Sequence, residues 1–211
     1  MQLLIASTNP GKIREFRQML GGGADMQFTD LAEHPDLPVV EETGRTFLAN
    51  ACLKAVQYAR SLHVWGLADD SGLAVDALGG SPGVFSARWA AMHQAGAGDA
   101  DNNALLLRQL AEIPPERRSA RFICSLALAD PLGRIFLTAS DAVEGRILTE
   151  SRGTNGFGYD PLFFVDSLGM TTAELPSDQK HRISHRGKAL RRLAALMRRA
   201  NLPLSGQSNP I

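Results

Sequence analysis

The sequence contains little cysteine and no long apolar run. Its two cysteines, Cys52 and Cys124, lie far apart in apolar patterns, so we interpret them as small core residues rather than as a disulfide or a metal pair. No run of eighteen apolar residues occurs, which predicts that there is no transmembrane helix. Residues 1–7 lack the basic region that opens a signal peptide. These features predict a cytoplasmic protein without a membrane partner.

Acidic residues are missing from the last part of the chain. No Asp or Glu occurs between Gln179 and Ile211, although the whole chain has 22 acidic and 22 basic residues. The basic residues of this segment are Lys180, Arg182, Arg186, Lys188, Arg191, Arg192, Arg198 and Arg199. This asymmetry predicts an anionic partner, such as a nucleotide, a nucleic acid or a phosphate group. For the distal arginines we favour the simpler interpretation of a solvated helix face.

Two adjacent carboxylates, Asp69 and Asp70, lie between two short apolar runs that predict buried strands. Ser71 and Gly72 follow them, and Asp-Ser-Gly is ordinary turn chemistry, so strand, exposed turn and strand are expected over residues 64–78. The alternative is a functional site. Ionised groups at a buried strand end are costly to desolvate, and metal binding or proton exchange would relieve that cost.

Two stretches on either side of a predicted helix extend this alternative. The loop from Ser7 to Lys12 joins a predicted strand to a helix start, a geometry that offers backbone N–H groups to an anion. It is not a Walker A loop, because the first glycine is missing and Ile13 stands where Ser or Thr should hold magnesium. Glu41 and Glu42 precede a helix, where either the helix dipole or a metal would explain them.

A glycine-rich loop and a cluster of donors lie in the last third of the chain. In residues 153–161, three glycines frame Phe157 and Tyr159. Such a loop can present an aromatic face to a base or sugar, or it can bury Phe157 in the core. The last helix is expected to open at residue 177 and brings a dense group of hydrogen-bond donors, including His185 and Arg186.

The remaining pattern predicts an α/β protein with a mixed sheet. Strands are expected over residues 3–6, 122–128, 135–139 and 144–148 and near 26–28, and helices over 12–20, 46–62, 101–113 and from 177. Residues 130–133 fit a type I turn that joins two of the strands, which makes part of the sheet an antiparallel meander. We expect one domain over residues 1–200 and a flexible tail over 201–211.

Five motifs occur in a fixed order, and together they are highly specific: Ser7-Thr8-Asn9-Pro10-Gly11-Lys12, Glu41-Glu42-Thr43-Gly44, Ala68-Asp69-Asp70-Ser71-Gly72-Leu73, Phe157-Gly158-Tyr159-Asp160-Pro161 and Ser184-His185-Arg186. Over about residues 1–200 the chain resembles the inosine/xanthosine triphosphate pyrophosphatase family, most closely its bacterial branch. The resemblance implies a two-lobed α/β fold around a long central mixed sheet flanked by helices, with the active site in the cleft between the lobes. It also implies a homodimer, a requirement for Mg²⁺, and hydrolysis of ITP, dITP or XTP to the monophosphate and pyrophosphate.

The resemblance also implies roles for individual residues. Asp70 would be the catalytic base and a metal ligand, and the second metal ligand would be Glu41 or Glu42, with Glu41 slightly favoured. Substrate contacts would come from Ser7, Thr8, Asn9, Pro10, Gly11, Lys12, Ser71, Phe157, Gly158, Tyr159, Asp160, Lys180, His185 and Arg186. The first loop departs from the family at Ser7, where Thr is usual, and at Pro10. Both changes look tolerable, because the hydroxyl is kept and proline removes a single donor.

Two rival interpretations remain. A related pyrophosphatase could act on pyrimidine or methylated nucleotides, but the donors at residues 184–186 suit a 6-keto purine, which presents an acceptor where adenine presents a donor. A nucleic-acid-binding protein could use the basic last helix, but this would leave both carboxylate pairs unexplained. The purine nucleotide substrate is therefore favoured over a nucleic acid.

Overall fold

The computed structural model describes residues 1–20 and 27–202. Most of the predicted tail over 201–211, and the first residue of the strand predicted near 26–28, lie outside these ranges. The strands are β1 (Gln2–Ala6), β2 (Gln27–Asp30), β3 (Trp65–Val75), β4 (Ser119–Ala129), β5 (Ile135–Ile147), β6 (Phe163–Val165) and β7 (Met170–Thr171). The helices are α1 (Pro10–Leu20), α2 (Phe47–Leu62), α3 (Trp89–Met92), α4 (Asp99–Gln109), α5 (Ser177–Ile183) and α6 (His185–Arg199), and short 3₁₀ turns occur between them.

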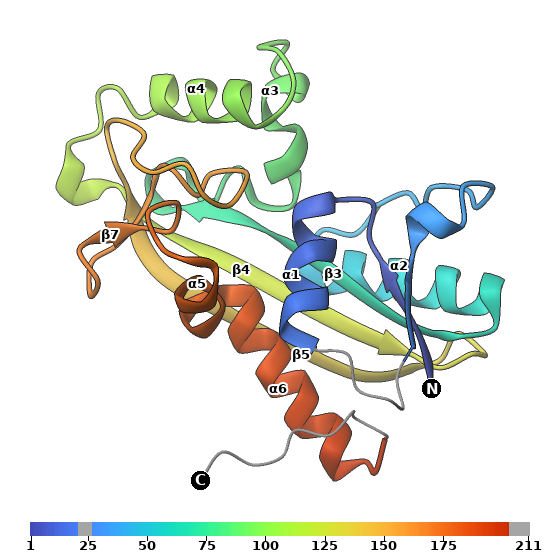
Figure 1. The fold of residues 1–211 in the computed structure, drawn as a ribbon. Helices are drawn as coiled ribbons and strands as arrows, with labels where there is room; N and C mark the ends of the chain where they lie inside the picture. Colours follow the sequence, from blue (N-terminus) through green and yellow to red (C-terminus); the bar gives the residue numbers. More distant parts are fainter. Residues whose placement is uncertain (21–26, 203–211) are drawn as a thin grey trace, which may run out of the picture. The chain divides into compact units, whose positions relative to one another are not determined.

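The strands of the described residues form one seven-stranded sheet in the order β2-β1-β3-β4-β5-β6-β7 (Figure 1). β1 pairs in parallel with both β2 and β3, whereas β6 pairs in antiparallel fashion with β5 and β7. The predicted α/β fold with a mixed sheet is therefore confirmed.

The chain divides into two compact units that are interleaved in the sequence. Unit 1 comprises residues 1–70, 125–140 and 189–211, of which residues 21–26 and 203–211 are not described; unit 2 comprises residues 71–124 and 141–188. The strands β3, β4 and β5 each contribute residues to both units. The boundary within β3 falls between the two consecutive motif residues Asp70 and Ser71.

The core of unit 1 is built on the alternation of side chains along β1. Leu4 and Ala6 pack in a buried cluster with Ala51, Ala55 and other residues of α2. Successive strand residues point to opposite faces, so the neighbouring buried residues of β1 point to the other face. Figure 1 shows α2 behind the strands β1 and β3, and α1 in front of these strands. The two helices of unit 1 that follow β1 and precede β3 therefore cover opposite faces of the sheet.

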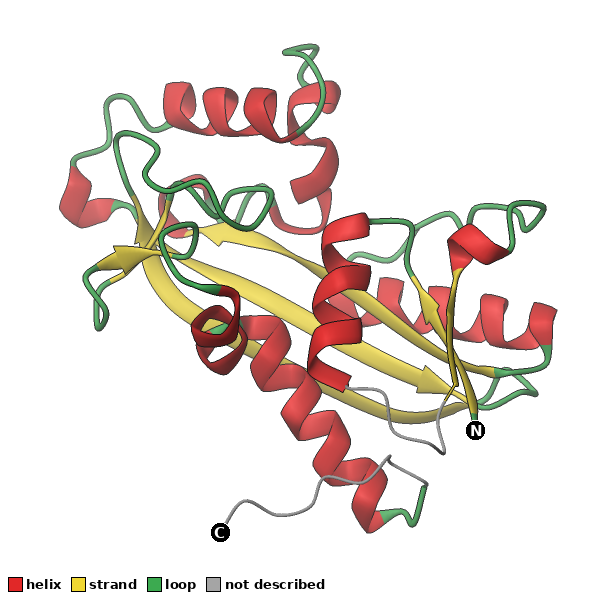
Figure 2. Cartoon of the chain, in the orientation of Figure 1, coloured by secondary structure: helices red, strands yellow, loops and turns green. Residues whose placement is uncertain are grey.

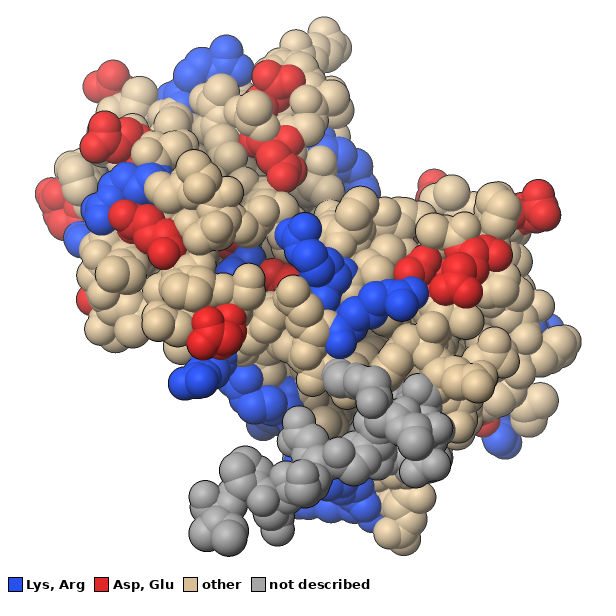
Figure 3. Space-filling model, viewed as in Figure 1, with Lys and Arg blue, Asp and Glu red and all other residues tan. Residues whose placement is uncertain are grey.

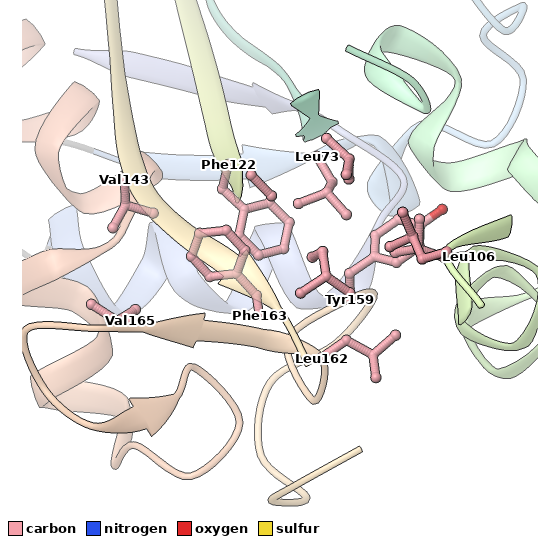
Figure 4. Close-up of a cluster of buried hydrophobic side chains, with 12 residues drawn as sticks. Leu73, Leu106, Phe122, Val143, Tyr159, Leu162, Phe163 and Val165 are labelled. Atoms are coloured by element: carbon pink, nitrogen blue, oxygen red, sulfur yellow. The ribbon is translucent and has the colours of Figure 1, made fainter. Parts of the chain in front are cut away.

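The core of unit 2 is aromatic and includes part of the glycine-rich loop. Phe122 of β4 and Phe163 of β6 pack with ring centroids 4.6 Å apart, and Leu73 and Leu106 belong to the same buried cluster (Figure 4). Tyr159 is also part of this cluster, with 3% of its surface exposed. The loop is thus anchored in the core through Tyr159.

Two predicted interruptions in strands are absent from the structure. The turn expected within residues 64–78 is wrong, because β3 runs unbroken from Trp65 to Val75 (Figure 2). The two carboxylates, although turn-favouring, pair with lysines of the neighbouring helices, as described below. The strands expected at 135–139 and 144–148 are one strand, β5, in which Ala139, Val143 and Ile147 are buried at a regular spacing.

The last helix, by contrast, is two helices. α5 ends at Ile183 and α6 begins at His185, because the backbone of Ser184 is extended, with ψ at 155°. The Ser184 hydroxyl accepts a hydrogen bond from Gly187 N–H at 3.1 Å, as a helix-capping residue does. The helix expected over 101–113 is also shorter at its end, since α4 stops at Gln109. The turn at Asp130–Gly133 is present, with Gly133 N–H donating to Asp130 C=O at 2.8 Å.

The close packing of β3 on α2 yields a stability prediction. A Cβ on Gly66 would lie 2.9 Å from the Ala55 carbonyl oxygen and 2.9 Å from Ala59 Cβ, so the helix would have to shift. We expect Gly66→Ala to lower the free energy of unfolding by about 1–3 kcal/mol, as overpacking does. Urea denaturation measures this change. The exposed β5 variant Thr138→Ala is the control, with an expected change within about 0.5 kcal/mol, and equal stability of both variants would contradict the prediction.

Candidate active site

The loop between β1 and α1 is shaped by its own side chains. Asn9 Oδ1 accepts a hydrogen bond from Lys12 N–H at 3.1 Å, and Ser7 Oγ accepts one from Asn9 N–H at 3.2 Å. Asn9 therefore caps the helix, and Pro10 occupies the first helical position, where its missing N–H is not needed. This local chemistry explains why α1 begins two residues earlier than its apolar stripe predicts.

The two carboxylates of β3 point to opposite faces of the sheet and reach different lysines. Asp69 is 1% exposed and forms an ion pair with Lys12 of α1. Asp70 is 5% exposed, and its Oδ1 lies 3.4 Å from Lys54 Nζ of α2. The strand pleat accounts for this division, because adjacent residues alternate between the α1 face and the α2 face.

Two side chains of α2, Asn50 and Lys54, contact Asp70. Asn50 Nδ2 donates to Asp70 Oδ2 at 3.1 Å, and Lys54 Nζ also lies 2.6 Å from Glu42 Oε1. Asp70 and Glu42 thus converge on one ammonium group. Glu41 is exposed, and its carbonyl oxygen accepts a hydrogen bond from Thr43 N–H at 3.1 Å.

The glycine of the Glu-Glu-Thr-Gly motif permits this arrangement. Gly44 N–H donates to Asn50 Oδ1 at 2.7 Å, and a Cβ on Gly44 would lie 2.6 Å from that oxygen. The motif therefore contacts the start of α2 closely, and the same Asn50 side chain links it to Asp70.

Burial and charge act against each other at this cluster. Burial raises the pKa of Asp70 above its ordinary value, although the positive charges of Lys54 and Lys12 pull it down. Burial alone would lower the pKa of Lys54, but Asp70 and Glu42 more than offset this, and the pKa of Lys54 is raised. Lys54 therefore keeps its charge at neutral pH, and Asp70 is a stronger base than an exposed aspartate.

The other predicted residues belong to unit 2, and two of them lie over the ring of Phe157. Phe157 is half-buried, and Lys180 Nζ and Arg186 Cζ lie 5.0 and 5.6 Å from its ring centroid, within cation–π range. Arg186 is 1% exposed and donates to Ser71 Oγ at 2.8 Å. His185 is stacked on Phe122, with ring centroids 4.9 Å apart.

Asp160 organises the loop that carries Phe157. Its Oδ2 accepts from Phe157 N–H at 2.8 Å and from Lys180 Nζ at 2.6 Å, and its Oδ1 accepts from Thr172 Oγ1 at 2.8 Å. The side chains of Asp160 and Lys180 are both more than nine-tenths buried. This pair is thus a structural element as well as part of the predicted site.

The structure adds residues that the motifs did not indicate. Lys54 and Asn50 contact Asp70 directly, and both were missed. Their spacing of four residues places them on one side of α2, so two polar residues within an otherwise apolar helix stripe were a usable signal.

The acid-free segment predicted to meet an anion is divided in the structure. Lys180 and Arg186 are buried in unit 2, whereas Arg191, Arg198 and other distal arginines of α6 are exposed, as their interpretation as a solvated face predicted. Figure 3 shows Lys and Arg side chains in the lower part of the view, where α6 lies in Figure 1, and a mixture of acidic and basic side chains elsewhere on the visible face.

Known proteins with similar sequences and structures show which family this chain belongs to. The sequence model of the Ham1 family matches residues 3–196. The chain belongs to the Ham1 family. A Ham1 protein from Staphylococcus aureus has a solved structure with a TM-score of 0.81 and 38% sequence identity, covering 95% of this chain and 100% of that one. A Ham1 protein from Coxiella burnetii gives a TM-score of 0.82 at 39% identity, with 94% and 99% covered.

Among curated Ham1-family relatives, a protein from Exiguobacterium sibiricum named dITP/XTP pyrophosphatase is 50% identical over 198 residues, which is 93% of this chain and 97% of that protein. A protein of the same name from Geobacter sulfurreducens is 49% identical over 191 residues, covering 90% and 92%. The family resemblance drawn from the five motifs is therefore confirmed.

The buried Asp160–Lys180 pair yields a second stability prediction. Removing one partner of a buried ion pair leaves an uncompensated charge, so we expect Lys180→Met to lower the free energy of unfolding by about 3–5 kcal/mol. Arg182 of the same helix is exposed and lies 3.9 Å from Asp178, and an exposed pair contributes about 0–1 kcal/mol. Urea denaturation of Lys180→Met beside Arg182→Met tests this. Similar stabilities of the two variants would show that Lys180 is not needed for folding.

Proposed function

We propose that this protein hydrolyses non-canonical purine nucleoside triphosphates, namely ITP, dITP and XTP, to the nucleoside monophosphate and pyrophosphate. The names of the relatives, which match more than nine-tenths of the chain, support this proposal. The single observation that carries it is the setting of Asp70, a buried carboxylate oriented by Asn50 beside the charged Lys54. Such a group can accept a proton from water next to cations that bind phosphates.

The residues of unit 1 suit a triphosphate. The loop from Ser7 to Lys12 ends at the start of an eleven-residue helix, whose dipole favours an anion at this end. Lys12 and Lys54 add two positive charges, each paired with a carboxylate of β3, that would also attract the phosphates of a substrate. This cradle neutralises phosphate charge but cannot distinguish one nucleotide base from another.

Asp70 acts as the general base in this proposal. Water attacks the α-phosphorus, its proton passes to a carboxylate oxygen of Asp70, and the bond to the pyrophosphate leaving group breaks. Burial, which raises the pKa of Asp70, makes it a better proton acceptor. Asn50 keeps the carboxylate in one orientation, because its amide donates to Oδ2.

The donor set of unit 1 fits Mg²⁺. Magnesium is usually held by one or two carboxylates together with substrate phosphates. Glu42 and Asp70 already share one cationic group, Lys54, so both carboxylates can face a common ion. Within residues 1–20 and 27–202, no three acidic, His or Cys side chains form a complete metal site, so substrate oxygens would supply further ligands. The ion would neutralise charge on the phosphate oxygens. Because Glu42 and Asp70 both contact Lys54, we favour Glu42 over Glu41 as the second metal ligand.

The residues of unit 2 suit the purine base. Lys180 and Arg186 lie over the ring of Phe157, 5.0 and 5.6 Å from its centroid, so a base that binds beside this ring would meet two cationic donors. Hypoxanthine and xanthine present an O6 acceptor to such donors, whereas adenine presents an amino group. Buried donors left unpaired against adenine would each cost about 1–3 kcal/mol.

Substrate selectivity tests the proposed function. We expect ITP to be hydrolysed roughly 10²-fold faster than ATP, because two donors would lose their acceptor. The measurement is the release of IMP and pyrophosphate in equal amounts in the presence of magnesium. Asp70→Asn is the control for contaminating activity and should lose about 10²–10⁴-fold in rate. Comparable turnover of ITP and ATP by the wild-type protein would refute the proposal.

The choice between the two glutamates can be tested with a matched pair of variants. We expect Glu42→Gln to raise the magnesium concentration needed for half-maximal ITP hydrolysis by about tenfold or more, because one of two carboxylate ligands loses its charge. Glu41→Gln should leave it within about twofold, since Glu41 is exposed. Titration of activity with magnesium measures both, and the reverse order would assign the ligand to Glu41.

A further inference from the structure

We propose that Asp99 and Asn103, in the first turns of α4, are positioning residues for base recognition. They hold the backbone of Gly158 and thereby fix the ring of Phe157. This inference rests on the proposed function, in which Phe157 carries the base. Asp99 and Asn103 belong to none of the five sequence motifs.

The glycines on either side of Phe157 do not by themselves fix its ring. The ring is flanked by Gly156 and Gly158, whose φ angles are +79° and +62°. Glycine adopts such left-handed conformations without steric cost, and it also gives the peptide groups on both sides of Phe157 wide freedom of rotation. The place of the ring must therefore be set by contacts from outside these three residues.

The contacts reach the backbone on both sides of Phe157 along the chain. On one side, Asp99 Oδ2 accepts from Gly158 N–H at 2.6 Å, and Asn103 Nδ2 donates to Gly158 C=O at 2.9 Å. Asp99 and Asn103 are four residues apart, so they lie on the same side of α4 and grip both polar backbone groups of one glycine. On the other side, Asp160 accepts from Phe157 N–H.

Helix α4, which carries Asp99 and Asn103, is fixed in the core of unit 2. Leu106 of α4 is fully buried in the cluster that also holds Tyr159, and Figure 4 shows the two side chains beside each other. The Tyr159 hydroxyl donates to Ser86 C=O at 2.9 Å. Tyr159 and α4 are thus anchored in the same core, so the two hydrogen bonds from α4 hold Gly158 in a fixed position.

Asp101 shows what an aspartate in the first turn of α4 does when it only stabilises the helix terminus. Asp101 lies in the same first turn and has the same favourable interaction with the helix dipole. Its Oδ2, however, accepts from Ala97 N–H at 2.7 Å rather than from the loop of Phe157. Asp101 is therefore the matched control for Asp99.

The test compares the binding of two ligands by calorimetry, IMP and pyrophosphate, since only IMP carries a base. We expect Asp99→Ala and Asn103→Ala each to weaken IMP binding by about tenfold, because part of the stacking interaction is lost. The affinity of these two variants for pyrophosphate should change by less than about twofold. Asp101→Ala should change the affinities for IMP and for pyrophosphate by less than about twofold. Asp99→Asn should recover most of the IMP affinity, because its amide oxygen can accept the same N–H.

A double-mutant cycle separates positioning from general structure. In a Phe157→Ala background, Asp99→Ala should have no further effect on IMP binding, because its effect passes through the ring. Amide hydrogen exchange should also be faster at Gly158 in Asp99→Ala than in wild type, a measurement that needs no nucleotide. Unchanged IMP affinity in Asp99→Ala, or a tenfold loss that persists without Phe157, would overturn the inference. A wild-type protein that binds pyrophosphate but not IMP would instead overturn the proposed function and, with it, this role.

Discussion

Two neighbouring carboxylates can be buried in β3 only because the strand pleat sends them to opposite faces of the sheet. Asp69 meets Lys12 from the helix on one face, and Asp70 meets Lys54 from the helix on the other. Neither charge is then isolated, which avoids the large penalty of a buried unpaired ion. The same two lysines are the cations available to phosphates in the proposed reaction. The stability of the strand and the binding chemistry therefore depend on one arrangement.

Much of the fold was predictable because apolar periodicity is a local signal. The helix over residues 46–62 and the strand around 122–128 follow directly from spacing, and the structure confirms both within a few residues. Polar residues within an element were the source of error. The turn predicted at Asp69–Gly72 failed because turn propensity is overridden when tertiary partners satisfy the carboxylates. The break at Ser184 was missed because the helical stripe continues on both sides of it.

The site was predictable only where motifs mark it. The loop at Ser7–Lys12 and the carboxylates Asp69 and Asp70 were singled out from the local sequence, and the resemblance then gave them roles. The contact of Lys54 with Asp70 depends on which side of α2 faces β3. The spacing of Asn50 and Lys54 marks one side of α2, but only the packing of α2 on β3 shows that this side meets Asp70. The magnesium requirement, the homodimer and the cytoplasmic location came from the resemblance or from composition and stay predictions. Tyr159, assigned to substrate binding by the resemblance, lies in the core of unit 2.

The interleaving of the two units has a consequence for how the chain folds during synthesis. Unit 1 needs residues 125–140 and the buried face of α6, both of which are translated after residues 71–124 of unit 2. Domains built from one continuous segment can fold in turn as they leave the ribosome. Here residues 1–70 cannot complete their sheet until most of unit 2 has been translated. Exposed strand edges in this segment favour pairing with other chains until the sheet is complete.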